Sequence, residues 1–204
     1  AYNFVLQDHL FEPNYGWSLP AHLFMVSGWS ARCTHPYRAR SCTPNLRNPD
    51  FSDKLAPKAP SYGWTDLTYM LHRHHVSWAY YVQGGAQPDC DNAEAMVCGG
   101  KKQGAGTPEI WNPLPDFVTV HRDHQLGNIR AASRFFSAAS RGNLPAVSWI
   151  VPNAAHSDHP PSSVAAGQRW VTSLVDAVMR SPEWKSSAIF LSWDDWGGFY
   201  DHVV

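Results

Sequence analysis

Two neighbouring carboxylates near the end of the sequence, Asp194 and Asp195, are the residues best suited to chemistry. They follow residues 188–193, a short apolar run that predicts a buried strand. Ligands in open α/β sheets bind outside the carboxyl ends of strands, and adjacent carboxylates repel each other unless a cation lies between them. The pair therefore predicts a divalent metal site, for which oxygen ligands allow Ca, Mn or Mg and a nearby imidazole would admit Zn. The alternative is a solvated turn in which an aspartate caps a helix.

Ser18 is a candidate nucleophile and metal ligand because it immediately precedes a predicted helix over residues 19–27, which ends at Gly28. A hydroxyl at a helix N-terminus faces free N–H groups and the positive end of the helix dipole, an environment that binds phosphate and stabilises an alkoxide. A nearby cation would lower the pKa of the hydroxyl further. The simpler interpretation is a structural N-cap, which is common at serine.

Two histidines, His156 and His159, lie in a polar segment that follows a predicted strand over residues 146–151. This segment also lies at the carboxyl end of a strand, so either imidazole could ligate a metal ion or donate to a phosphate oxygen. His159 is a candidate for catalysis and substrate binding, and His156 for substrate binding. Surface histidines without a function are the alternative.

The elements that must position these residues alternate between helices and strands. Periodicity predicts helices over residues 19–27, 64–74, 127–141 and 164–180, and strands over residues 76–82, 146–151 and 188–193. This order predicts an α/β fold with a mostly parallel sheet and helices on both faces. Residues 1–204 are expected to form one domain, with loop excursions near residues 31–62 and 84–109.

Four cysteines form two close pairs in polar loops, Cys33 with Cys42 and Cys90 with Cys98. Two local disulfides would stabilise these loops and would favour an exported protein, secreted or periplasmic. Four reduced cysteines in a cytosolic enzyme are the alternative. A zinc site is less favoured because no Cys-x2-Cys spacing occurs.

Composition excludes several classes of protein. With 44% hydrophobic and 16% charged residues, the 204-residue chain is not disordered, and a net charge of −1 without a basic block argues against nucleic-acid binding. No apolar run is long enough to predict a transmembrane helix. The ten tryptophans leave open a non-catalytic domain that binds choline or a sugar, with Asp194 and Asp195 as a calcium site.

A specific pattern extends over residues 159–202, near the end of the sequence. It runs from His159-Pro160-Pro161 through Ser181-Pro182-Glu183-Trp184-Lys185 to Ser192-Trp193-Asp194-Asp195-x-Gly197-Gly198-Phe199-Tyr200-Asp201-His202. This pattern resembles the bacterial phosphoesterase family, which holds phospholipases C and acid phosphatases and belongs to the alkaline phosphatase superfamily. The resemblance implies an alkaline-phosphatase-like sheet, a metal site at Asp194 and Asp195, a phosphate-facing His159, and a nucleophile at Ser18 within Gly16-Trp17-Ser18-Leu19-Pro20.

The chain departs from the family pattern in two places. The family continues with Pro-Asn-Arg after its nucleophile, whereas this chain has Pro20-Ala21-His22, and the family's Glu-Asn-x-Ser-Phe-Asp motif, which completes the metal site, does not occur. Family members also run on beyond the last residues of this chain. The resemblance therefore implies a fragment that is incomplete at both ends, with an activity that could be lost.

The function implied by the resemblance is metal-assisted hydrolysis of a phosphoric ester through a serine nucleophile. The substrate class is a phospholipid, as for a phospholipase C, or a small phosphomonoester. The residues do not distinguish a phospholipase from a phosphatase. They also do not identify the metal ion or the oligomeric state.

Overall fold

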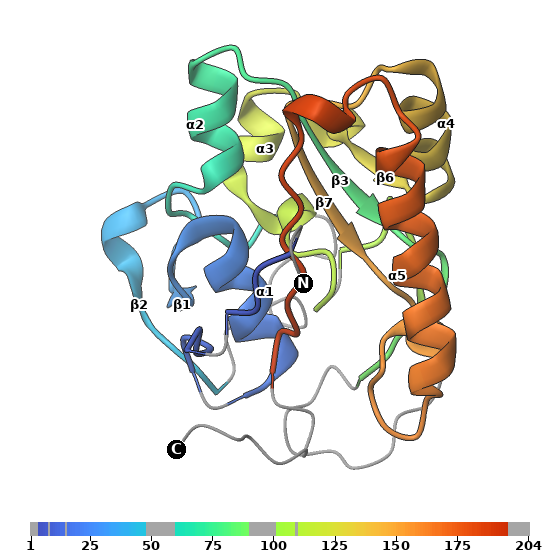
Figure 1. The fold of residues 1–204 in the computed structure, drawn as a ribbon. Helices are drawn as coiled ribbons and strands as arrows, with labels where there is room; N and C mark the ends of the chain where they lie inside the picture. Colours follow the sequence, from blue (N-terminus) through green and yellow to red (C-terminus); the bar gives the residue numbers. More distant parts are fainter. Residues whose placement is uncertain are drawn as a thin grey trace.

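The computed structural model describes residues 4–7, 9–14, 16–47, 60–89, 101–108 and 110–195. Its central element is a parallel sheet of three strands in the order β6 (Ile129–Ala131), β3 (Trp78–Val82) and β7 (Val147–Val151) (Figure 1). Tyr80 on β3 is paired with Ile129 on one side and with Trp149 on the other. Every residue of β3 is buried, as expected for a central strand covered on both faces.

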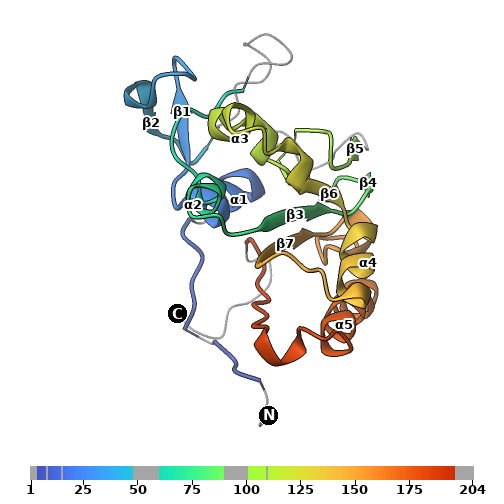
Figure 2. The same cartoon turned by 90° about the horizontal axis from the view of Figure 1, so that it is seen from above.

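Helices cover both faces of this sheet (Figure 2). They are α1 (Ser18–Ser27), α2 (Leu67–Arg73), α3 (Val118–Arg122), α4 (Ser133–Arg141) and α5 (Val164–Met179). Alternate residues of β3 enter two separate cores because successive side chains of a strand point to opposite faces. Trp78, Tyr80 and Val82 pack with residues of α1 and α3, whereas Ala79 and Tyr81 pack with residues of α4 and α5. This arrangement confirms the predicted α/β class.

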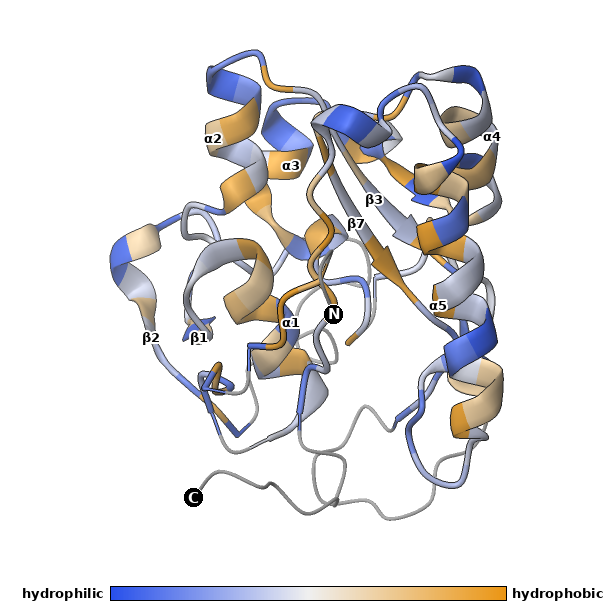
Figure 3. Cartoon of the chain, in the orientation of Figure 1, coloured by the Kyte–Doolittle hydropathy of each residue, from blue (hydrophilic) through white to orange (hydrophobic). Residues whose placement is uncertain are grey.

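Many hydrophobic residues of the chain face these two cores. Figure 3 shows hydrophobic positions on α1, on α5, along the sheet and along the segment that precedes Asp194. Leu174 and Val178 are the buried members of the stripe that predicted α5, and the helix ends one residue before its predicted limit. No helix among the described residues is long and apolar enough to cross a membrane.

The excursions contain small antiparallel ribbons. One pairs β1 (Ala31–Cys33) with β2 (Cys42–Pro44), and the other pairs β4 (Gly85–Ala86) with β5 (Lys102–Gln103). Cys33 and Cys42 are directly opposite each other and form the predicted disulfide. Cys90 and Cys98 lie outside the described residues, so their pairing stays a prediction. Short 3₁₀ turns occur at Ala39–Ser41, Leu114–Asp116, Leu126–Asn128, Ala154–His156 and Trp184–Ser186.

The helix boundaries at α1 and α2 are set by local chemistry. Ser18 was predicted to be the N-cap of this helix, but it is the first residue of α1, because the cap position falls on Trp17. The helix ends at Gly28, whose φ of 66° is a left-handed conformation that glycine adopts without strain. At α2 the carboxylate of Asp66 accepts the N–H of Tyr69 at 3.2 Å and so caps the helix.

Two predicted elements are wrong. Residues 127–141 were predicted as one helix, but Ile129–Ala131 form β6 and the helix begins only at Ser133. Residues 188–193 form no strand, and Phe190 is 93% exposed. In both cases strand formation depends on a neighbouring strand: β6 has one in β3, whereas no described strand lies beside residues 188–193.

Candidate active site

Ser18 is positioned at the start of α1 by an unusual turn. Gly16 has a φ of 123°, which glycine adopts far more readily than other residues, and the extended backbone of Trp17 then leads into the helix. Ser18 is 1% exposed, and its Oγ is a buried atom that makes no hydrogen bond to the described residues. A buried hydroxyl without a partner at a helix N-terminus is costly for folding and suited to a ligand.

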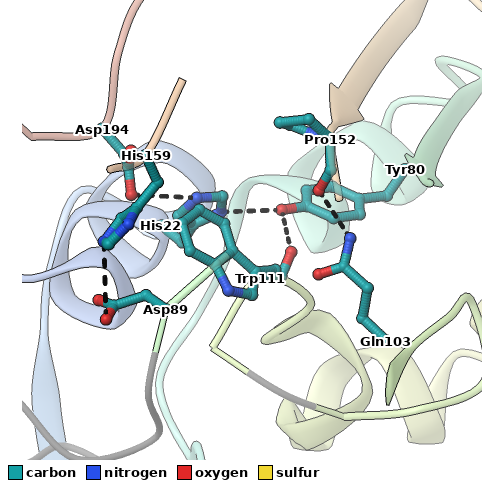
Figure 4. Close-up of polar contacts among 8 residues, drawn as sticks. All are labelled: His22, Tyr80, Asp89, Gln103, Trp111, Pro152, His159 and Asp194. Carbon is teal, nitrogen blue, oxygen red and sulfur yellow. Dashed lines mark hydrogen bonds and ion pairs between the residues drawn. The ribbon is translucent and has the colours of Figure 1, made fainter. Parts of the chain in front are cut away.

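Asp194 reaches the same place from the other end of the chain. Its Oδ2 lies 3.6 Å from Nε2 of His22, one turn after Ser18 on α1 (Figure 4). Burial raises the pKa of Asp194, but His22 and the nearby Ser18 hydroxyl outweigh burial, so the pKa is below the ordinary aspartate value. Ser18 is thus close enough to stabilise the carboxylate charge, although it does not reach hydrogen-bond geometry. The carboxylate is therefore ionised at neutral pH.

A chain of hydrogen bonds fixes the His22 ring from its other side. Its Nδ1 lies 3.1 Å from the Tyr80 hydroxyl, which donates to the backbone oxygen of Trp111 at 2.8 Å (Figure 4). The ring also packs edge-to-face on the Trp111 indole, with 4.9 Å between centroids. Burial, with a smaller contribution from Asp194, raises the pKa of Tyr80, so the phenol stays protonated.

His156 lies in a polar cluster at the carboxyl ends of β3 and β7. Its Nδ1 is 3.2 Å from Oε1 of Gln83 and 3.1 Å from Oδ1 of Asn153. Because both neighbours are acceptors, Nδ1 carries the proton and Nε2 is the nitrogen left for a ligand. The ring stacks on Trp170 of α5 with centroids 6.0 Å apart, which fixes its plane.

His159 is held by two other contacts. Its Nδ1 is 2.8 Å from the backbone oxygen of Pro160, and its Nε2 is 3.7 Å from Oδ1 of Asp89 (Figure 4). The family resemblance implies that His159 faces the phosphate together with Ser18. The described contacts join His159 to Asp89 instead, and they include none to Ser18 or Asp194.

Glu12 and Asn14 are residues that the sequence analysis missed. Burial raises the pKa of Glu12, and the neighbouring Asp195 and Asp194 carboxylates raise it further. Asn14 is buried and donates from Nδ2 to the Gly16 oxygen at 2.5 Å, while its Oδ1 and the Glu12 Oε2 are buried without a hydrogen-bond partner in the described part of the chain. The Glu12 carboxylate therefore lies close enough to Asp194 and Asp195 to interact with them, and Asn14 contacts the turn that precedes Ser18.

The comparison with protein families shows which family this chain belongs to. The Phosphoesterase family matches residues 1–204. The chain belongs to the Phosphoesterase family.

This family member is similar to several phospholipases C. It is 31% identical to a non-hemolytic phospholipase C of Pseudomonas aeruginosa over 155 residues, which are 74% of this chain and 20% of that protein. It is 39% identical to non-specific phospholipase C1 of Arabidopsis thaliana over 79 residues, 35% of this chain and 15% of that protein. It is 41% identical to phospholipase C A of Mycobacterium tuberculosis over 71 residues, 34% of this chain and 14% of that protein. The chain thus spans about a fifth or less of these relatives.

The family implies a divalent metal ion, and the donor atoms around Asp194 fit one. The buried atoms without hydrogen bonds among the described residues include four oxygens, namely Oγ of Ser18, Oδ2 of Asp194, Oε2 of Glu12 and Oδ1 of Asn14, together with the indole nitrogens of Trp17 and Trp111. Oxygen acceptors without donors are what a cation satisfies. No three His, Cys, Asp or Glu side chains of the described residues are close enough to hold an ion by themselves. A metal site here therefore needs the serine hydroxyl or an amide oxygen as a donor.

One missed residue has a signal in the sequence. His22 lies four residues after Ser18, and residues at this spacing share a helix face. The predicted helix and the predicted nucleophile were therefore sufficient to place His22 beside the site. Glu12 and Tyr80 have no comparable signal, because their approach to Asp194 depends on chain segments far apart in sequence.

Proposed function

We propose that the chain carries the nucleophile of a phosphoric ester hydrolase, with a phospholipid or small phosphomonoester as substrate. The observation that supports this proposal best is the buried Ser18 hydroxyl, which lies at a helix N-terminus beside the ionised Asp194 and makes no hydrogen bond to the described residues. A serine in this position is suited to attack on phosphorus rather than to helix capping. Similarity to phospholipases C favours a phospholipid.

In the proposed reaction Ser18 Oγ forms a bond to phosphorus while the bond to the alcohol oxygen breaks. The alcohol leaves with the electron pair and takes up, through solvent, the proton that the Ser18 hydroxyl loses. The oxygen of a water molecule then bonds to phosphorus as the bond from phosphorus to Ser18 Oγ breaks, and a proton from that water returns to Oγ. The N–H groups of Ser18 and Leu19, the first two residues of α1, lack intrahelical acceptors and would bind the nonbridging phosphate oxygens, whereas Pro20 has no N–H and Ala21 donates to the Trp17 oxygen. A bound divalent cation would lower the pKa of the Ser18 hydroxyl and offset the negative charge on the phosphate.

In this mechanism Asp194 stays ionised and does not transfer protons. Its lowered pKa makes it a weak base, so its contribution is to hold a cation next to Ser18. Asp195 lies beside it and is proposed as a second metal ligand.

Both loop histidines are proposed to bind substrate. His156 offers Nε2 from a ring whose Nδ1 and plane are already fixed. His159 can bind a phosphate oxygen when its Nε2 turns away from Asp89. The segment that carries them follows β7, where ligands of parallel sheets bind.

The serine assignment is tested with Ser18→Ala and with Ser140→Ala, an exposed serine of α4, as the matched control. Activity is the release of nitrophenol from nitrophenyl phosphate and from nitrophenylphosphorylcholine, and of diacylglycerol from phosphatidylcholine vesicles. Ser18→Ala should lower kcat by about 10³-fold or more, as expected for a lost nucleophile. Mass spectrometry of the acid-quenched enzyme should find phosphate on the Ser18 peptide. Full activity in Ser18→Ala refutes the proposal, and the two substrate types separate phosphatase from phospholipase.

A non-catalytic binding domain is less consistent with this structure. A Trp-rich choline or sugar module would be expected to be all-β, whereas a parallel sheet here lies between two layers of helices. Trp64, Trp78 and Trp111 are also core residues rather than a binding surface.

We also propose that the protein is exported. The support is the disulfide between Cys33 and Cys42, because such bonds persist in oxidising compartments. Fractionation of cells with thiol labelling tests this: the protein should be extracytoplasmic with Cys33 and Cys42 protected from alkylation until reduced.

A further inference from the structure

His22 is the buried titratable group that the proposed reaction leaves without a role. It is 5% exposed and lies between two functional partners, Tyr80 at Nδ1 and Asp194 at Nε2 (Figure 4). An imidazole can present either an N–H group or a lone pair to Asp194. The orientation of the ring decides which it does.

Tyr80 determines the tautomer of His22. The Tyr80 hydroxyl uses its one proton to donate to the Trp111 oxygen, so its own oxygen can only accept from His22. In the neutral ring that would bind a cation, the proton therefore lies on Nδ1 and the lone pair of Nε2 faces Oδ2 of Asp194. Histidines that bind metals are oriented in this way, with the second ring nitrogen donating to a fixed acceptor. Without a cation, the attraction of His22 that lowers the pKa of the Asp194 carboxyl requires a proton on Nε2 as well, so the cation would take the place of that proton.

The distance between the two facing atoms fits a shared ion better than a direct bond. A charge-assisted hydrogen bond between nitrogen and a carboxylate is about 2.7–2.9 Å long, whereas Nε2 and Oδ2 are 3.6 Å apart. Two donors about 2.1 Å from one Zn²⁺ lie roughly 3.0–3.5 Å apart at angles of about 90–110°. The observed separation thus needs a change of only a few tenths of an ångström to hold an ion between them.

An independent observation points to a ligand at the same place. Oδ2 of Asp194 is buried without a hydrogen-bond partner in the described chain, and so is Oγ of Ser18, a residue 99% buried on the same face of α1. A proton donor or a cation would satisfy both. The hydroxyl also explains how an ion could be held where no third His, Cys, Asp or Glu is close enough among the described residues.

We propose that Nε2 of His22 is a nitrogen ligand of the cation that Asp194 and Ser18 bind, and that Tyr80 is the residue that positions it. The inference rests on the proposed function in that the same ion serves Ser18. A mixed nitrogen and oxygen site selects a borderline transition metal, such as Zn²⁺, Mn²⁺ or Co²⁺, over Ca²⁺ or Mg²⁺.

The test measures metal binding without turnover. The 204-residue protein is titrated with Zn²⁺ and Ca²⁺ by calorimetry, and Cu²⁺ bound to it is examined by pulsed EPR, which detects the remote nitrogen of a coordinated imidazole. The variants are His22→Gln, Tyr80→Phe and, as the matched control, His72→Gln at the exposed end of α2.

The proposal predicts a specific pattern. His22→Gln should weaken Zn²⁺ binding by about 10–100-fold, change Ca²⁺ binding much less, and remove the imidazole signal. Tyr80→Phe should keep the signal but change the coupling of the remote nitrogen, because that atom loses its hydrogen bond. His72→Gln should match the wild type, and far-UV circular dichroism checks that each variant is folded.

Two results overturn the inference in distinguishable ways. If the wild type binds metal and His22→Gln retains both affinity and signal, the nitrogen ligand is refuted, while the serine mechanism stands on its own test with Ser18→Ala. If the wild type binds no divalent ion, the cation site itself is refuted, and phosphoserine formation then decides separately whether Ser18 is a nucleophile.

Discussion

Replacing Tyr80 by phenylalanine isolates the hydrogen-bond chain that holds His22. The substitution keeps the ring in its core position and removes one oxygen, which accepts from His22 at 3.1 Å and donates to the Trp111 oxygen at 2.8 Å. Both partners are left buried without this bond. Leaving a buried polar group unsatisfied costs about 1–3 kcal/mol. With two such groups, we expect a loss of roughly 2–4 kcal/mol in the free energy of unfolding.

The next residue along β3 offers a matched control. Tyr81 is as deeply buried as Tyr80, at 0% exposure, but points into the other core. Its hydroxyl lies near Arg130 yet makes no hydrogen bond of normal geometry to the described residues. Tyr81→Phe should therefore change stability by less than about 1 kcal/mol, because it removes at most a poorly aligned contact with Arg130.

Urea unfolding without reductant, followed by tryptophan fluorescence and circular dichroism, measures both variants. With a slope of about 2 kcal/mol per molar urea, Tyr80→Phe should lower the midpoint by roughly 1–2 M. Equal midpoints for Tyr80→Phe and Tyr81→Phe would refute the assignment of the two hydrogen bonds, and with it the argument for the His22 tautomer.

Three further predictions follow from single contacts. The pKa of Glu12 is raised above 4.5 in the folded protein, so its contribution to the free energy of unfolding is complete at low pH and is lost as the pH rises through the folded pKa. Glu12→Gln should therefore be as stable as the wild type in acid and more stable at neutral pH. In thermal unfolding the variant should also gain less stability than the wild type from added divalent metal. Asp89→Asn removes the carboxylate beside His159 and should lower kcat/KM about 10-fold. It should change the free energy of unfolding by under about 1 kcal/mol, because the ion pair is partly exposed. In a His159→Asn background the substitution should have no further effect on activity. Gly167→Ala would place a Cβ against the Asp158 carboxylate and should lower the free energy of unfolding by about 1–3 kcal/mol, although alanine ordinarily stabilises a helix. An unchanged urea midpoint would contradict the close approach of Asp158 to Gly167.

Local patterns in the sequence predicted those elements whose formation depends on burial alone. The β-branched and aromatic residues of β3 and the apolar stripe of α5 have a period that fits one element, and both form close to their predicted limits. Residues 129–131 and 188–193 were mispredicted because strand formation there depends on a neighbour. Ile129 becomes a strand residue by pairing with Tyr80, which no local pattern encodes.

The site divides in the same way. The sequence by itself determined which residues could do chemistry, Ser18, Asp194 and Asp195, because their types and local context are readable, and the family match covers the segments that carry them. Only the tertiary structure decided that Ser18 and Asp194 lie near each other, that His159 contacts Asp89, and that His22 points its Nε2 at Asp194. Those outcomes depend on how segments from opposite ends of the chain pack against one sheet, and on a tyrosine from its central strand whose single hydroxyl proton sets the direction of the imidazole.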